Sequence, residues 1–253
     1  MLILSLFPGI GLLDMAFEQE GFCVVRGPDL LWGGCVKTFH PPAGRFDGVI
    51  GGPPCKAHSP LANVVRAVHG PDSVAEDLIP EFVRVVREAQ PRWYLMENVS
   101  RAPHPDVDGY RNDSFLLNTR WLGNSQNRLR RFTFGTTAPY ATRIEIETQP
   151  LEPFEFEPAV TTNSGGRRAV IKYDASGCVR GKQGHADHHR LHGRSIERMN
   201  ELQGLPRDFL RDAPFTKEGK SIVIGNGVPL VMGRAVAKAI KQAIAGAKNE
   251  VAA

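Results

Sequence analysis

The chain has 253 residues, and at roughly 100–200 residues per domain this length predicts one large domain or one domain with a small attachment. Hydrophobic residues make up 42% of it and charged residues 23%, which excludes a collagen-like, coiled-coil or disordered chain. The net charge of +4 permits contact with a polyanion but is too small to demonstrate one.

The cysteines and the N-terminus favour a cytoplasmic protein. No two of the four cysteines have Cys-x-x-Cys spacing, and a chain of this length does not need disulfides, so free thiols in a reducing compartment are expected. The N-terminus lacks a basic leader, and no run of 18 apolar residues occurs. We therefore expect neither export nor a membrane-spanning segment.

The first half of the chain alternates apolar strands with helices. Residues 2–7 are an apolar run that stops at a Pro-Gly-Ile-Gly turn, after which apolar residues recur at helical spacing from Leu12 to Phe17. Residues 22–25 and 46–50 have the character of short buried strands. The pattern predicts a strand, a glycine turn and a helix, followed by two further strands.

A second helix and a fourth strand follow. Residues 74–89 place apolar side chains on one helical face, and the apolar strand 93–96 ends at Glu97-Asn98. Such alternation predicts an α/β fold in which a doubly wound, mostly parallel sheet is covered on both faces. Ligands of these sheets bind at the carboxyl ends of the strands, where this chain has glycines, Cys55 and Glu97.

Beyond Gly135 the chain changes character. Residues 136–193 are rich in turns and locally polarised, with five glutamates and no lysine or arginine in 145–157 and seven lysines and arginines in 163–194. Residues 229–247 then have the pattern of an amphipathic helix. We expect three parts: a main domain over 1–135, a small region over 136–193, and a segment over 194–253 that returns to the main domain.

Three features of the sequence contain residues that could take part in catalysis or binding. Cys55 follows Gly-Gly-Pro-Pro at a strand end, although a lone cysteine is more often a buried structural thiol. Glu97 also stands at a strand end, where burial would raise its pKa toward use as a general acid; taken alone it is typical of a helix cap or a surface charge. Gln126, Arg128 and Arg130 are two residues apart and would share one strand face, which is commonly a solvated one.

Together, six short motifs resemble the cytosine-5 DNA methyltransferase family in the family's order and along almost the whole chain. They are Leu6-Phe7-Pro8-Gly9-Ile10-Gly11, Gly51-Gly52-Pro53-Pro54-Cys55 with Ser59, Met96-Glu97-Asn98-Val99, Gln126-Asn127-Arg128-Leu129-Arg130, Leu202-Gln203-Gly204-Leu205-Pro206, and Ile224-Gly225-Asn226-Gly227-Val228-Pro229. Each motif is a weak signal, and the six in order are a strong one.

The resemblance implies a methyltransferase that uses S-adenosylmethionine and acts on a cytosine flipped out of DNA. Cys55 would add to C6 of the ring as a thiolate, because C5 itself is a poor nucleophile. Glu97 would hold N3 and the exocyclic amine, Arg130 would contact the cytosine O2, and Arg128 would orient the base or bind a phosphate. The main domain would then be catalytic, and 136–193 would recognise the target sequence.

The resemblance also implies binding residues. Phe7 would pack on the adenine, Gly9 and Gly11 would admit the amino-acid end of the cofactor, and Asp29 would bind the ribose, although after Pro28 it is also a plausible turn residue. The remaining expected cofactor contacts are Leu30, Pro53 and Asn226. The residues expected to contact nucleic acid are Lys56, Ser59, Gln126, Arg167, Arg168 and Arg190.

The chain departs from the family pattern at several places. Lys56 replaces the usual glutamine after the cysteine, where it could lower the cysteine pKa, contact DNA or bind a modified donor, and His58 replaces a common aromatic residue. No acidic residue lies between Asp29 and Asp47, so the family's third cofactor carboxylate is missing or shifted. Arg198 and Glu201 stand in swapped order, which an i,i+3 ion pair tolerates.

The region 136–193 is short for a target-recognition domain. Few side chains can reach base edges, so we expect a recognition sequence of about 2–4 base pairs. This region also contains His185, His188, His189 and His192. Three alternatives remain for these histidines. They could contact the DNA backbone together with Arg190 and Arg194, they could belong to a solvated loop, or they could bind zinc. No regular ligand pairing supports zinc.

Our leading interpretation is a monomeric enzyme of a restriction-modification type that methylates duplex DNA in a bacterial or phage-infected cell. A tRNA-directed relative is a second interpretation, because phosphate contacts are common to both substrates. A third is a catalytically idle, DNA-binding scaffold, which the departures around Cys55 and the missing carboxylate favour. The presence of Cys55, Glu97 and Arg130 argues against that scaffold.

Overall fold

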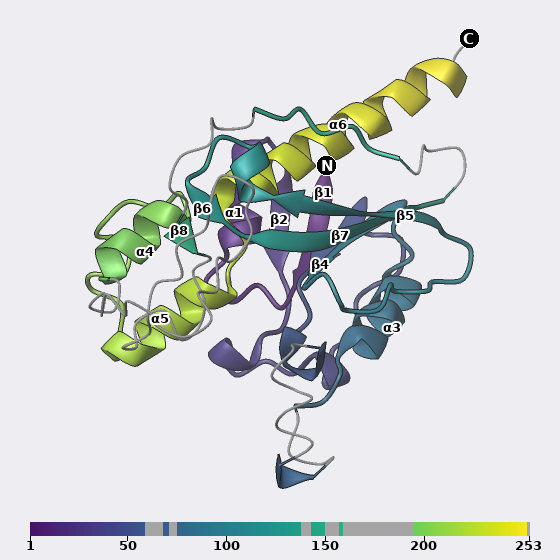
Figure 1. Ribbon diagram of the computed structural model, residues 1–253. Helices are drawn as coiled ribbons and strands as arrows, with labels where there is room; N and C mark the ends of the chain where they lie inside the picture. The colour runs from purple at the N-terminus through teal and green to yellow at the C-terminus, as the bar shows by residue number, and fades with distance from the viewer. Residues whose placement is uncertain (59–67, 71–74, 138–142, 150–156, 159–194, 252–253) are drawn as a thin grey trace.

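The fold was analysed in a computed structural model, which describes residues 1–58, 68–70, 75–137, 143–149, 157–158 and 195–251. A six-stranded mixed sheet runs through the middle of the molecule (Figure 1). Its strand order is β2-β1-β3-β4-β7-β5. The strands are β1 (Leu2–Leu6), β2 (Cys23–Arg26), β3 (Gly48–Gly51), β4 (Trp93–Asn98), β5 (Arg111–Asn118) and β7 (Leu129–Thr136).

The first four strands are parallel and the last two are antiparallel to their neighbours. β1 pairs in parallel with β2 and β3, and β3 pairs in parallel with β4. β7 runs antiparallel to both β4 and β5. The expected mostly parallel α/β sheet is confirmed, with an antiparallel pair at one edge.

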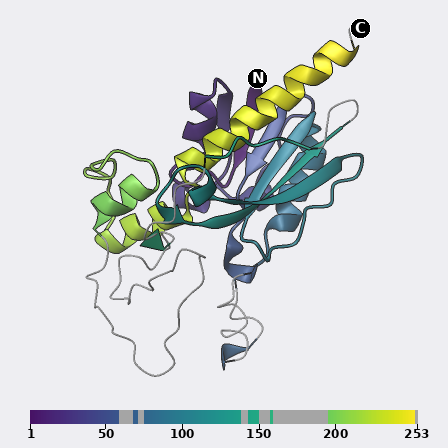
Figure 2. The ribbon, with the colours of Figure 1, turned by 45° about the horizontal axis from the view of Figure 1, so that its top comes forward.

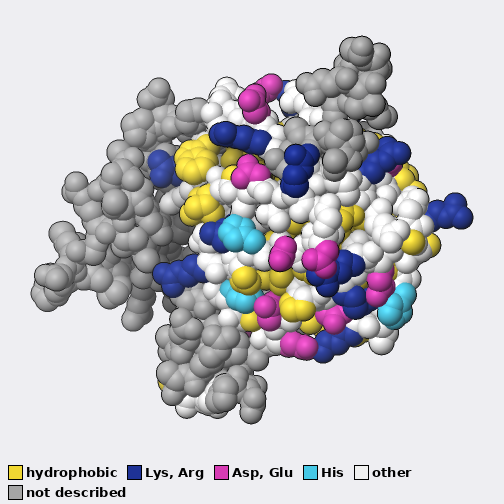
Figure 3. Space-filling view, turned by 90° about the vertical axis from the view of Figure 1, so that its right-hand side faces the viewer, with side chains coloured by type: hydrophobic (Ala, Val, Ile, Leu, Met, Phe, Trp, Pro, Cys, Tyr) yellow, Lys and Arg dark blue, Asp and Glu magenta, His cyan; other side chains and the backbone are white. Residues whose placement is uncertain are grey.

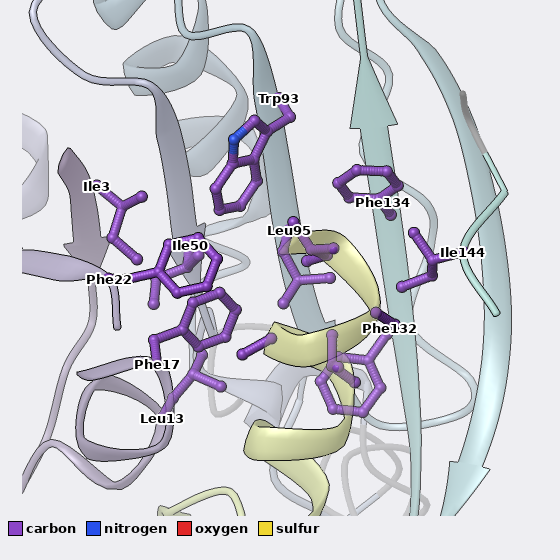
Figure 4. Close-up of a cluster of buried hydrophobic side chains, with 14 of the residues drawn as sticks. Ile3, Leu13, Phe17, Phe22, Ile50, Trp93, Leu95, Phe132, Phe134 and Ile144 are labelled. Carbon is purple, nitrogen blue, oxygen red and sulfur yellow. The ribbon is translucent and has the colours of Figure 1, made fainter. Parts of the chain in front are cut away.

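Side chains of the central strands alternate between two hydrophobic cores, as expected for a sheet buried on both faces. On one face, Ile3, Ile50 and Leu95 pack with α1 (Leu12–Gln19) and α6 (Leu230–Val251). Figure 4 shows this cluster, in which Phe17 and Phe22 lie near Trp93 while Phe132 and Phe134 extend it along β7.

The opposite face is covered by α3 (Ile79–Ala89). This helix begins at Ile79 and not at 74, because Pro80 occupies its first turn and the Asp77 side chain accepts a hydrogen bond from the Ile79 N–H. Around it, acidic and basic side chains are interspersed (Figure 3), for example in the pairing of Arg84 with Glu81 and Glu88. Among the described side chains in this view, positive and negative charges are mixed and neither sign dominates.

The C-terminal part folds back onto the start of the chain. Helices α4 (Ile196–Leu202) and α5 (Lys217–Asn226) form a small cluster at one side of the sheet (Figure 2), next to β6 (Gln126–Asn127) and β8 (Glu157–Pro158). The chain then turns at Gly227, where a Cβ would lie 2.7 Å from Cδ2 of Leu12. This close approach joins the C-terminal part to the first turn of α1.

One helical stretch within the described residues, Lys217–Ala245, is long and apolar enough to cross a membrane by length and composition. Of the apolar window that meets this criterion, 61% is buried inside the protein, and α6 packs against α1 and the sheet. Its apolar character is explained by the core that it helps to build.

Candidate active site

Glu97 and Arg130 meet at the end of β4 because of the register between β4 and β7. Glu97 pairs with Phe132, so Arg130, two residues away on the same face of β7, lies just past the end of β4. The Arg130 Nε is 3.0 Å from Glu97 Oε1, and both side chains are largely buried. The structure thus brings together two of the residues expected to be catalytic.

The loop that leads to Cys55 passes beside the same carboxylate. A Cβ at Gly52 would lie 3.2 Å from Glu97 Oε2, and the Asn98 side chain donates a hydrogen bond of 3.2 Å to the Pro53 carbonyl. The loop enters the short helix η3 (Cys55–His58), in which the Cys55 thiol is free and partly exposed. The loop with Cys55 and the Glu97–Arg130 pair therefore lie at the ends of neighbouring strands.

Burial of Glu97 raises its pKa above the ordinary value, and the positive charges of Arg130 and Arg128 act in the opposite direction. A carboxyl in this position retains a proton more readily than one in water. It can then donate a hydrogen bond to a ring nitrogen as well as accept one. This is the behaviour required of an acid that stabilises an attacked pyrimidine.

The Arg128 side chain does not share an open strand face with Arg130, as the two-residue spacing predicts. The strand is interrupted at this residue, and the side chain turns inward, where it donates hydrogen bonds to the carbonyls of Gly225 and Gly227 at 3.1 Å and 2.9 Å. It is only 1% exposed, and burial lowers its pKa to about 9. The expectation of a phosphate or base contact does not fit this burial. Arg128 instead anchors the C-terminal part.

Gln126 is also fully buried, so the expected contact with nucleic acid does not fit its position. Its amide donates to the Leu202 carbonyl at 2.8 Å and to the Gln203 side chain at 3.3 Å. Gln203 in turn donates to the carbonyls of Ile224 and Gly227. Gln203 was not among the residues singled out from the sequence, although the motif that contains it was.

The turn after β1 has the backbone shape expected of a close ligand approach. Phe7, Gly9 and Gly11 have φ angles of 55°, 56° and 81°, in the left-handed region that glycine tolerates and that costs Phe7 strain. A Cβ at Gly9 would meet no atom within 4 Å, so the space beside this glycine is open. Gly11 is the N-cap of α1.

Asp29 and Trp32, in the segment that follows β2, hold this turn by hydrogen bonds. One carboxylate oxygen of Asp29 accepts from the Gly9 N–H and the other from the Leu31 N–H, both at 2.8 Å. The Trp32 indole donates to the Gly9 carbonyl at 2.7 Å. Asp29 thus caps the short helix η1 (Leu30–Trp32) beside the glycine turn, and Trp32 is a neighbour of the turn that the motifs did not reveal.

The other expected cofactor residues lie around the same strand ends. Leu30 is 76% exposed in η1, Pro53 is buried beside Asn98, and Asn226 is exposed at the end of α5, between the two glycines that Arg128 binds. Their roles stay predictions. The expected nucleic-acid residues Ser59, Arg167, Arg168 and Arg190, the four clustered histidines and most of 136–193 lie outside the described residues, as does the Lys56 side chain.

The structure shows the partners of the residues at two departures from the family motifs. The imidazole Nε2 of His58 lies 3.1 Å from the Asp77 carboxylate. Arg198 and Glu201 form the expected i,i+3 ion pair at 3.0 Å, and Glu201 also pairs with Arg207. No group of three or more potential metal ligands occurs among the residues that the structure describes.

Solved structures of methyltransferases share this fold. A putative DNA modification methyltransferase encoded within an E. coli prophage superposes with a TM-score of 0.62 at 16% identity, over 97% of this chain and 99% of that one. The Entamoeba histolytica methyltransferase EhMeth gives a TM-score of 0.63 at 11% identity, over 96% and 98%. At these identities the likeness concerns the fold alone.

Residues 36–165, just over half of the chain, match the model of the C-5 cytosine-specific DNA methylase family, and the chain belongs to that family. It is 25% identical to the type II methyltransferase M.MthTI of Methanothermobacter thermautotrophicus over 335 residues, covering 98% of this chain and 99% of that protein. It is 32% identical to M.NgoPII of Neisseria gonorrhoeae over 151 residues, but spans only 39% of that protein.

Proposed function

We propose that this DNA (cytosine-5)-methyltransferase moves a methyl group from S-adenosylmethionine to C5 of a cytosine flipped out of duplex DNA, through a covalent bond between Cys55 and C6. The observation that carries the proposal is the buried Glu97–Arg130 pair, beside which Gly52 lies in the loop that precedes Cys55. A pyrimidine placed there would meet a nucleophile and an acid.

The first step is attack on the ring. The Cys55 thiolate forms a bond to C6, and the electron pair of the C5–C6 bond moves toward C5. Glu97 holds N3 and the exocyclic amine, and its raised pKa favours the protonated form that can donate to N3. Arg130 lies against Glu97 and offers its guanidinium to the cytosine O2.

The later steps restore the ring. When bound, S-adenosylmethionine supplies an electrophilic methyl group on a positively charged sulfur. C5 takes that methyl group, then loses its hydrogen as a proton to a base, and the returning electron pair expels Cys55 as a thiolate. The products are 5-methylcytosine and S-adenosylhomocysteine, and Cys55 is regenerated without any redox partner.

The glycine turn fits the donor. The open space beside Gly9 permits close approach of a ligand backbone, and Asp29 retains carboxylate lone pairs for ribose hydroxyls while it accepts from Gly9 and Leu31. Phe7 follows β1 at the same strand end and would cover the adenine. We also propose that Lys56, Ser59, Arg167, Arg168 and Arg190 contact DNA and that the enzyme is a cytoplasmic monomer.

Bisulfite sequencing of plasmid DNA tests the proposal, after incubation of the full chain with S-adenosylmethionine. We expect 5-methylcytosine at one short recurrent sequence, and no methylation by the Cys55→Ala variant, which should still bind the donor. Parallel assays with tritiated donor compare duplex DNA with tRNA. Transfer to tRNA alone, or an intact chain that binds no donor, would overturn the proposal.

A further inference from the structure

A buried ion pair stands beside the glycine turn, and neither the family motifs nor the proposed chemistry uses it. Asp14, in the first turn of α1, is fully buried. The Ser5 hydroxyl donates to one of its carboxylate oxygens, and the Arg26 Nε lies 3.0 Å from the other. Burial raises the pKa of Asp14, whereas Ser5 and Arg26 act in the opposite direction, so this carboxylate depends on its two partners.

The register of the sheet explains why these three residues meet. Ser5 on β1 pairs with Arg26, the last residue of the edge strand β2, so both side chains leave the same face of the sheet. That face is covered by α1, which brings Asp14 onto Ser5 (Figure 1). Arg26 is therefore held at its Nε by a carboxylate from the helix that follows the glycine turn.

The guanidinium of Arg26 reaches the glycine turn itself. A Cβ at Gly11 would lie 2.8 Å from a terminal nitrogen of Arg26 and 3.0 Å from its Cζ, so the guanidinium occupies the side of Gly11 that any other residue would fill. The Arg26 side chain is 53% exposed. A positive charge thus stands at the turn, with its Nε edge toward Asp14 and much of its surface open to a ligand.

We propose that Arg26 binds the carboxylate of the amino-acid end of the methyl donor, and that Asp14 positions Arg26 for this contact. The inference rests on the proposed function, which places that end of the donor at Gly9 and Gly11. The donor also carries a sulfonium and an ammonium group, both of which arginine repels. Its carboxylate is the one anionic group that the planar fork of a guanidinium matches.

Comparing two donors tests this contact directly. Isothermal titration calorimetry of the full chain is performed with S-adenosylmethionine and with decarboxylated S-adenosylmethionine, which keeps the sulfonium and the amine. We expect the native chain to prefer the carboxylated donor by about tenfold or more, the size expected for one charge-assisted hydrogen bond. Arg26→Gln should lose that preference while its affinity for the decarboxylated donor stays within about twofold.

Arg234→Gln is the matched control, because Arg234 also pairs through its Nε with a carboxylate of the α1 region, Glu20, and is similarly exposed at 55%. It should change neither affinity. If Arg26→Gln does not fold with Asp14 unpaired, the Asp14→Asn, Arg26→Gln double variant removes both charges and is compared in the same way. Asp14→Asn alone should weaken binding of the carboxylated donor more than that of the decarboxylated one.

Two results would refute the inference and leave the proposed function intact. In one, the native chain binds both donors equally well; in the other, Arg26→Gln weakens both donors to the same extent, as a merely structural role would. A native chain that binds neither donor would refute the proposed function as well. The native titrations therefore separate failure of the proposed function from failure of the inference, and the Arg26→Gln titrations separate donor binding from a merely structural role.

Discussion

The Nε of Arg130 and the Oε1 of Glu97 lie 3.0 Å apart, and this pair links the antiparallel edge of the sheet to its parallel centre. Glu97 belongs to the last parallel strand, whereas Arg130 arrives from the opposite direction on β7. An arginine can reach the end of β4 here because β7 begins where β4 ends. The antiparallel direction of β7 therefore places a guanidinium beside the Glu97 carboxylate.

Arg130→Ala should impair both stability and catalysis. Removing one partner of a largely buried ion pair costs about 3 kcal/mol, and removing a donor to a developing charge costs about 10²-fold in kcat. Urea denaturation and methyl-transfer kinetics measure the two effects. Arg131→Gln is the control, because Arg131 donates to the Ala102 carbonyl instead. Equal losses in the two variants would contradict a specific role for Arg130.

Glu97→Gln should change how stability depends on pH. The folded-state pKa of Glu97 is raised above the unfolded value of 4.5, so between the two values the folded chain binds more protons than the unfolded one. This contribution to stability is fully present below the unfolded pKa and is lost as pH rises through the folded pKa. Glutamine does not titrate, so the stability of the Glu97→Gln variant does not decrease with pH at this position.

The free energy of unfolding of Glu97→Gln, minus that of the native chain, should therefore increase with pH and level off above the folded pKa. Urea denaturation at a series of pH values from 4 to 9, chosen to bracket the ordinary carboxyl pKa, measures the difference. A difference that is constant with pH would show that Glu97 has the same pKa in both states. Methyl transfer by the variant should be lost at every pH.

Much of the fold could be predicted from the sequence because the parallel strands are short apolar runs that end at glycine, proline or polar residues. The edge strand β5 was not predicted. Its sequence from Arg111 begins with polar residues, and its burial pattern is mostly partial, so neither a hydrophobic run nor clean alternation marks it. An edge strand receives its order from its neighbour, here β7, which a local pattern cannot show.

The candidate site could be predicted in part. The motifs identified Cys55, Glu97 and Arg130, and the glycine turn has the positive φ angles that its glycines imply. The burial of Arg128 could not be predicted from two-residue spacing, because it depends on the carbonyls of Gly225 and Gly227, which lie 97 and 99 residues further along the chain. The Asp14–Arg26 pair depends on strand register, which no motif encodes.

Arg128→Met should destabilise the attachment of the C-terminal part. Arg128 and Gln203 both donate to the Gly227 carbonyl, and Arg128 also donates to Gly225. In this variant the buried Gly225 carbonyl loses Arg128 as a donor, which costs about 1–3 kcal/mol, whereas the Gly227 carbonyl keeps Gln203 as a donor until both side chains are replaced. Because the two side chains share an acceptor, the double variant with Gln203→Leu should differ from additivity by at least about 0.5 kcal/mol in a denaturation cycle. Strict additivity would show that the two residues act independently.

The recognition sequence should be short. Residues 136–193, the region expected from the sequence to recognise the target, are few, and each base pair read in the major groove needs at least one well-placed contact. Genome-wide or plasmid bisulfite mapping should give a consensus of about 2–4 base pairs. A six-base consensus would show that side chains outside 136–193 also read the DNA.

Gly52→Ala should slow the chemistry while leaving the donor site intact. Its methyl group would stand 3.2 Å from Glu97 Oε2, tighter than ordinary contact, so the carboxylate or the loop to Cys55 must shift by a few tenths of an ångström. A displacement of 1 Å can cost 10²-fold in rate, so we expect kcat to fall by up to about tenfold.

Gly219→Ala in α5 is the comparison for Gly52→Ala, because its methyl group would stand at a similar 3.3 Å from the Thr216 hydroxyl, away from Glu97. That variant should retain its activity, because the strain of its new methyl group falls on the Thr216 cap of α5 and not on Glu97. Single-turnover methyl transfer, with donor affinity measured separately, distinguishes the two substitutions. If Gly52→Ala is fully active, the contact between this glycine and Glu97 does not constrain the reacting geometry, and the loop has more freedom than its prolines suggest.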